Sequence, residues 1–338
     1  MFNTTVNFSV ELSNGTTLSP QSRVVWPFDS IMTLTCSILM AILNSALAAI
    51  FLVKRDLRSA FASYLTALLL FNVLVSIHGF LYVIKSQYPV YMRSHRLCDF
   101  RLYVSWVVTG IPLNLHVLIT INRIWAIAFP MSYRNHHSPR LAWMLVAAVT
   151  VYVHVVCLPG VVLDGIYYRM PVEKGCVINT LAQPRWNQTA MLLIFEFPVA
   201  FIGVSWIYLL AKQRRHRHSV GTIALVAMGT QVQDGPTPPR NENTGKMQSN
   251  RRRFSRGFVV FSALTLSAVL CWTPYETYYV IWAFVDLNET DQRFVMLCLG
   301  LYLIQPVLDP VLIVLTMPDL RRTIRGIFDK MKAVFTRS

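Results

Sequence analysis

The sequence predicts an all-α membrane protein: a seven-transmembrane-helix bundle with an amphipathic membrane-surface helix after the seventh span. Of its 338 residues, 54% are hydrophobic and 14% are charged, whereas soluble domains contain roughly 25% charged residues. The apolar residues gather in stretches of about 20, the length that crosses a bilayer core of ~30 Å. Lys and Arg lie between these stretches, so the net charge of +15 does not indicate a nucleic-acid partner.

The apolar stretches set the expected spans and the domain boundaries. We expect an extracellular, glycosylated tail over 1–28, a bundle over 29–316, and a cytoplasmic amphipathic helix with a short tail over 317–338. The third cytoplasmic loop is expected at about 212–256. The seven spans are expected near 29–53, 60–84, 99–128, 141–163, 189–211, 257–285 and 294–316.

The segment after the seventh span has the pattern of a helix that lies on a membrane surface. Apolar residues recur there at helical spacing, with basic residues between them: Leu320, Ile324, Phe328, Met331 and Phe335. Such a helix binds the anionic inner leaflet. A soluble tail helix is the alternative.

Two independent signals place the N-terminus outside the cell. Most Lys and Arg residues then fall in cytoplasmic loops and in the tail, as the positive-inside rule requires. Asn-x-Ser/Thr sequons are glycosylated only on the lumenal side, and all five lie outside in this topology: Asn3, Asn7, Asn14, Asn187 and Asn288. The protein is therefore expected to be a multi-pass plasma-membrane glycoprotein.

Residues at specific points of these spans resemble the rhodopsin-like class of G-protein-coupled receptors. The segment INRIWAIAFPMSYR, with Arg123, is similar to the family's Asp-Arg-Tyr segment at the end of the third helix. CWTPY at 271–275 resembles the Cys-Trp-x-Pro motif, and LDPVLI from Leu308 resembles the Asn/Asp-Pro-x-x-Tyr motif. Asn44 and Pro198 match further landmarks, so the resemblance covers almost the whole chain.

The resemblance implies a role for several residues. It pairs Cys98 with Cys176 in a disulfide and brings Arg123 into contact with the G protein. Trp272 relays ligand binding to a hinge at Pro274, because proline removes a helical hydrogen bond. The implied function is a receptor that passes an extracellular signal, or its own constitutive activity, to heterotrimeric G proteins. Membrane lipids surround it.

Departures from the family pattern concern activation. Asn122 and Ile124 replace the usual Asp and Tyr beside Arg123, which predicts raised basal signalling. Asn72 stands where the family keeps the Asp of a sodium site, whereas Asp309 appears before Pro310 on the seventh span. Sodium binding stays open. Tyrosines used in activation are replaced at Trp206 and Ile313, which keeps a non-coupling binding or scavenger receptor as an alternative.

The ligand pocket is expected between the outer halves of the spans. Ser105 stands where amine receptors place an Asp, so the usual amine site is absent. Glu196 and Glu276 are candidates because an ionisable group inside a span is costly without a role. Alternatively, Glu276 hydrogen-bonds to a neighbour such as Tyr302 or His78, or faces water. The candidate pocket consists of Ser105, Trp106, Thr109, Glu196, Tyr275, Glu276, Tyr279 and Tyr302.

Other function classes receive less support. The seventh span from Phe294 to Met317 contains no lysine, so no retinal Schiff base is expected, and we expect no other cofactor. An enzyme is not predicted, because the sequence contains no metal-ligand cluster, phosphate loop or nucleophile motif. A transporter is a weaker alternative, because the sequence shows no internal repeat and no pair of interrupted helices. The ligand and the G-protein subtype are not predicted.

Overall fold

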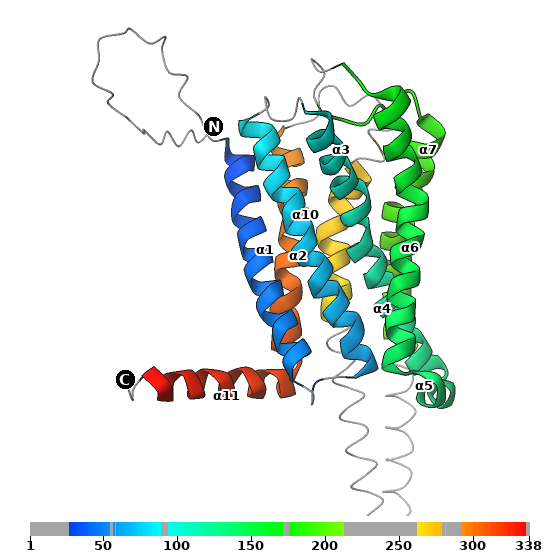
Figure 1. The fold of residues 1–338 in the computed structure, drawn as a ribbon. Coiled ribbons are helices and arrows are strands. Elements are labelled where there is room, and N and C mark those ends of the chain that lie inside the picture. Colours follow the sequence, from blue (N-terminus) through cyan, green and yellow to red (C-terminus); the bar gives the residue numbers. More distant parts are fainter. Residues whose placement is uncertain are drawn as a thin grey trace, which may run out of the picture.

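The fold is a bundle of helices that run side by side (Figure 1). The computed structural model describes residues 27–54, 57, 59–88, 94–171, 176–212, 262–278, 281 and 292–335, and its regular structure is helical throughout those ranges. The first two spans are α1, Phe28–Val53, and α2, Ala60–Gln87. The last span is α10, Gln292–Thr316, and the segment 262–278 before it is helical.

The third and fifth spans are each built from two helices joined by a π-helical turn. In the third span the turn Val104–Val108 joins α3, His95–Tyr103, to α4, Gly110–Ala128. In the fifth span α7, Pro184–Ala190, leads into the turn Met191–Glu196. A proline follows each turn at 112 or 198. Proline has no backbone N–H and its ring crowds the carbonyl group four residues earlier. A wider π-helical turn makes room for the ring and lets that carbonyl accept another hydrogen bond.

The fourth span is α6, Pro139–Leu163, and a π-helical turn continues it over Asp164–Tyr168. It begins with a cap, since the Ser138 side chain accepts a hydrogen bond from the Leu141 backbone at 3.3 Å. α2 begins in the same way at Ser59, which accepts from Ala62 at 3.1 Å. A short helix, α5, Pro130–His136, connects the third and fourth spans.

The expected spans agree with these helices, and the differences lie at their ends. Six described helices are long and apolar enough to cross a membrane. The part of the expected 257–285 span that the structure describes is helical over 262–278. The third and fifth spans begin at His95 and Pro184, four or five residues earlier than expected, and the fourth ends later, at Tyr168. Hydropathy misses these ends because polar residues in loops and in the outer turns of helices look alike.

The expected surface helix is present as α11, Pro318–Phe335, which extends sideways from the end of α10, on the side of the bundle opposite to α5 (Figure 1). Leu320 is fully buried and packs on the core of the bundle. Phe328 and Met331 are 63% and 48% exposed, as expected for side chains that face lipid. The side chain of Phe335 lies outside the described residues.

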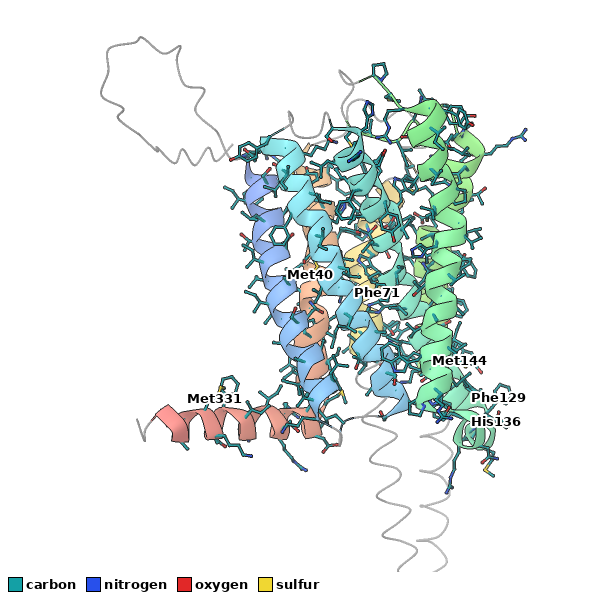
Figure 2. The ribbon with its side chains drawn as sticks, in the orientation of Figure 1. Met40, Phe71, Phe129, His136, Met144 and Met331 are labelled. Atoms are coloured by element: carbon teal, nitrogen blue, oxygen red, sulfur yellow. A yellow bond between two sulfur atoms is a disulfide. The ribbon has the colours of Figure 1, made fainter. Side chains whose placement is uncertain are left out.

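The bundle packs a dense interior and leaves apolar side chains on its outer face. Met40 of α1 is buried, while Met144 of α6 is 68% exposed (Figure 2). The largest fully buried side chains include Tyr64, Leu65, Leu68, Leu115, Ile119 and Ile202. An apolar outer face is what lipid requires, and packing in the interior then holds the helices together.

Candidate ligand and signalling sites

A cavity of about 610 Å³ opens between the outer halves of the helices. One side is a single face of the third span, where Arg101, Ser105 and Thr109 follow one another at four-residue spacing. The helix 262–278 and α10 supply Tyr275, Glu276 and Tyr302 on another side. This volume is typical of small-molecule sites. The remaining lining residues are His78, Leu102, Trp106, Met170, Val177, Ile178, Thr180, Leu181, Asn187, Met191 and Phe195.

The floor of this outer pocket is formed around Glu276 and Trp272. A second cavity, of about 10 Å³, is lined by Trp272, Glu276 and Pro306 among others. Thr109, Phe195, Glu276 and Tyr302 line both cavities, so they mark the level at which the outer pocket ends. Glu276 is 4% exposed, and Tyr275 stacks on Tyr302 with the ring centroids 4.5 Å apart.

The roof of the pocket is held by the Cys98–Cys176 disulfide. Arg101 donates from Nη1 to the carbonyl of Cys176 at 2.9 Å, which ties the loop to the third span a second time. Outside this point, Arg169 bonds to Asp99 and lies 3.2 Å from Asp164. The loop is therefore fixed by a covalent bond, a charge-assisted hydrogen bond and ion pairs.

Most of the sequence-predicted pocket residues lie together. Six of them line the outer pocket: Ser105, Trp106, Thr109, Tyr275, Glu276 and Tyr302. Glu196 does not line it, although it is close enough to Glu276 for their charges to interact. Glu196 is the last residue of the π-helical turn Met191–Glu196. Tyr279 lies outside the described residues.

Sequence reasoning missed Arg101 as a pocket residue. The signal was available, because Arg101 is an ionisable residue inside an apolar span, the same rule that selected Glu276. Its spacing from Ser105 and Thr109 also places it on their face. Arg101 was not selected because the span was expected to start at residue 99, and a basic residue so close to the end of a span is usually exposed.

A polar cluster crosses the bundle beneath Trp272. The Asn72 amide donates to Asp309 at 2.9 Å and to Asn44 at 3.2 Å, and Gln305 donates to the other carboxylate oxygen at 2.9 Å. His116 approaches the same carboxylate at 3.4 Å, and its ring stands edge-on to Trp272 at 5.1 Å between centroids. Asn72 and Asp309 thus meet across the bundle, a contact that the sequence analysis did not predict, and His116 was also missed.

The end of the third span that leads into α5 carries Arg123 and Asn122. The guanidinium carbon of Arg123 lies 3.4 Å from the centroid of the Phe61 ring, a cation–π contact. Its Nε has no hydrogen-bond partner among the described residues. Asn122 is buried and bonds to His137 at 2.8 Å and to the Tyr133 hydroxyl at 3.3 Å.

The ring of His137 completes a cluster that also contains Asn122, Tyr133 and Tyr64. Its Nε2 lies 3.2 Å from the Tyr64 hydroxyl, and its ring stacks on Tyr133 at 4.3 Å. Burial and the nearby charge of Arg123 hold the pKa of His137 below its usual value. Burial also raises the pKa of Tyr133, so this phenol keeps its proton and donates to Asn122. The cluster joins α2, the third span and α5.

Several other expected positions are placed as follows. Pro274 and Pro310 lie within helical segments of the last two spans, and Ile313 is fully buried. Ile124 and Trp206 pack partly buried against the core. Asn187 lies in α7 and lines the pocket, while Asn3, Asn7, Asn14 and Asn288 lie outside the described residues. Among the described residues, no group of His, Cys, Asp and Glu could hold a metal ion.

Comparisons with known proteins agree with this arrangement. The family described as 7 transmembrane receptor (rhodopsin family) matches residues 43–312. The muscarinic acetylcholine receptors M4 of Gallus gallus and Xenopus laevis are each 22% identical over 174 residues, which is 49% of this chain and 35% of theirs. A gonadotropin-releasing hormone receptor of Octopus vulgaris is 23% identical over 266 residues, 73% of this chain and 60% of its own length.

The matched segment runs from the middle of α1 into α10 and contains the pocket, the polar cluster and Arg123. The helices, the Cys98–Cys176 bridge and the family match all point to one conclusion. This chain belongs to the rhodopsin family of seven-transmembrane receptors.

Proposed function

We propose that this protein is a plasma-membrane receptor that binds an extracellular ligand in the outer pocket and activates heterotrimeric G proteins at its cytoplasmic end. The N-terminus lies outside in this proposal, as the distribution of basic residues and sequons indicates. The whole protein's activity is inferred from the family, because the chain spans 35% of the muscarinic relatives and 60% of the gonadotropin-releasing hormone receptor.

The observation that carries the proposal is a continuous path of contacts from the pocket floor to the middle of the bundle. Trp272 lines the floor cavity beside Glu276, and its ring contacts His116. His116 in turn contacts Asp309 on α10. A ligand that changes the position of Trp272 would therefore also act on the contact between the third and seventh spans, where the family's motifs lie.

The relatives do not carry a ligand over to this chain. Their names refer to two different ligands, acetylcholine and gonadotropin-releasing hormone. Ser105 also stands where amine receptors carry the acidic partner of the ligand ammonium. The proposed receptor therefore recognises its ligand with other residues of the outer pocket.

The cytoplasmic end supports elevated basal signalling. Arg123 packs on the Phe61 ring, and its neighbour Asn122 bonds to His137 instead of providing a carboxylate. The Arg123 side chain has no adjacent acid, so it can move towards another partner at little cost in free energy, because no ion pair has to be broken. Contact of Arg123 with a G protein is thus less opposed than in receptors that restrain this residue.

The test is basal second-messenger output in cells that carry the protein at their surface, measured with reporters for the main G-protein classes. We expect output above mock-transfected cells and its loss in Arg123→Ala. The matched control is Arg140→Ala, which removes one exposed charge at the start of α6 and should keep the output. Surface expression without output in any reporter would contradict basal coupling and favour the non-coupling binding receptor.

A further inference from the structure

We propose that the outer pocket takes an elongated dipolar ligand, whose cationic group lies at Glu276 on the floor and whose anionic group lies at Arg101 near the roof. This proposal rests on the function proposed above and specifies the chemical class of the ligand. It follows from three features of the pocket: a buried cation, a buried acid, and the apolar distance between them.

The cationic feature is Arg101. Its side chain lines the pocket and is 7% exposed. Its Nη1 donates to the carbonyl of Cys176 at 2.9 Å and lies 4.0 Å from the Cys176 sulfur, while its Nε has no partner among the described residues. A guanidinium carries five N–H donors and a full charge. The described acids nearest to the roof, Asp99 and Asp164, pair with Arg169, so this buried charge calls for an anion from the pocket.

The acidic feature is Glu276. It lies at the floor and is 4% exposed. Among the described residues, Glu276 forms no ion pair with Lys, Arg or His. A buried carboxyl group is costly to ionise without a cation, and a bound cation removes this cost. A ligand ammonium or guanidinium group at the floor would therefore be favoured.

The spacing of these two features fixes the shape of the ligand. Thr109 lines the floor cavity together with Glu276, and Arg101 precedes it by eight residues on the same face of the third span (109 − 101 = 8). Eight residues of regular α-helix would separate the two levels by ~12 Å, and the π-helical turn Val104–Val108 within this segment makes the separation somewhat smaller. No ion pair joins Arg101 to Glu276 among the described residues, so each calls for its own counter-charge from the ligand.

Aromatic side chains line the pocket at its floor and above it. Trp106 is held in place by Trp186, 5.0 Å away between ring centroids, and Tyr275 stacks on Tyr302. Phe195 completes this part of the lining. The ligand should therefore carry its charges at its ends and an apolar or aromatic group between them. A simple amine would leave Arg101 unpaired, and a simple acid would leave Glu276 unpaired.

The probe for the test is the tripeptide Gly-Phe-Gly, which has a free amine, a free carboxylate and an aromatic centre. Its extended length of ~10 Å suits the separation of the two charges once both side chains reach inwards. Thermal unfolding of the purified full-length protein is measured with millimolar probe, with its N-acetylated form and with its C-terminal amide. We expect the doubly charged form to raise the unfolding midpoint and each capped form to need at least tenfold higher concentration.

Variants assign each end of the probe to one residue. Glu276→Gln should abolish the preference for the free amine over the acetylated form while keeping the preference for the free carboxylate. Arg101→Gln should do the reverse, and Arg101→Lys should keep part of the preference for the carboxylate. Arg185→Gln, which removes an exposed charge of α7 outside the pocket lining, should keep both preferences. If Arg101→Gln does not fold, Arg101→Lys and the amide probe carry the comparison.

The remaining outcomes overturn the proposal. Equal stabilisation by the free and acetylated forms removes the cation site, and equal stabilisation by the free and amidated forms removes the anion site. No stabilisation by any form rejects a dipolar site of this length, and Arg101 is then only a tether of the loop. If no form of the probe stabilises the protein but signalling still depends on Arg123, the proposed function stands and only the dipolar site is rejected. If the probe stabilises the protein but no Arg123-dependent signalling is found, the dipolar site stands and the proposed function is rejected.

Discussion

The imidazole Nε2 of His116 lies 3.4 Å from a carboxylate oxygen of Asp309, and the two side chains are 2% and 0% exposed. This contact joins α4 to α10 in the middle of the bundle, directly beneath Trp272. Amide donors from Asn72 and Gln305 complete the surroundings of the carboxylate. A buried acid is thus met by three donors from three helices.

Removing one member of this pair is expected to destabilise the protein strongly. Asp309→Asn or His116→Leu alone should cost roughly 3–5 kcal/mol, because each leaves a buried group without its partner. The double variant should cost clearly less than the sum. Thermal unfolding of the four proteins in detergent measures this coupling. Additivity within about 0.5 kcal/mol would show that the two groups do not interact.

A second prediction concerns the pH dependence of stability. Burial and the charge of Arg123 lower the pKa of His137, so the folded protein binds a proton less readily than the unfolded chain. This contribution is fully present above the ordinary value of about 6.5 and is lost as the pH falls below it. The unfolding midpoint should drop between pH about 7.5 and about 5.5, on either side of that value, and His137→Asn should reduce the drop.

The neighbouring histidine supplies the control for this experiment. His136 lies in α5 with an exposed side chain, and it bonds only to the carbonyl of Ser132 among the described residues. His136→Asn should leave the pH dependence of the midpoint in place. An equal effect of the two substitutions would contradict the assignment to His137.

A third prediction concerns basal signalling. Asn122→Asp places a carboxylate beside Arg123 and keeps the acceptor that Tyr133 uses at 3.3 Å. An ion pair of about 1 kcal/mol would shift the resting equilibrium roughly fivefold towards the inactive state, so basal output should fall by that factor. Asn122→Ala, which adds no charge, should not lower the output. A fall of the same size in both variants would mean that the effect comes from disturbed packing.

A fourth prediction concerns the helix contact behind the pocket. A Cβ atom added to Gly160 would lie 2.0 Å from the ring of Trp186, which donates to the carbonyl of Val156 at 2.9 Å. Gly160→Ala should therefore cost about 1–3 kcal/mol in thermal stability. Gly203→Ala is the control, because the nearest atom there is 3.9 Å away. Trp186→Leu should restore part of the stability in the double variant, and no recovery would place the clash elsewhere.

Much of the site could be predicted from the sequence. Ser105, Trp106 and Thr109 line the pocket together with Tyr275, Glu276 and Tyr302, and their places along the spans, which the resemblance supplied, lie at one level of the bundle. Glu196 lies in the π-helical turn Met191–Glu196 and does not line the pocket, and the sequence analysis did not predict this turn. Arg101 was overlooked because hydropathy places the end of a span only within several residues.

The sequence by itself determined the spans, the position of Arg123 and the cysteines available for the bridge, because lipid imposes long apolar helices and the motifs have fixed places along them. Only the tertiary structure decided which buried polar groups meet. His116 reaches Asp309, Arg101 reaches the carbonyl of Cys176, and Arg123 lies on Phe61. These contacts depend on how each helix is rotated and shifted against its neighbours, which packing across the whole bundle sets and spacing along one helix does not.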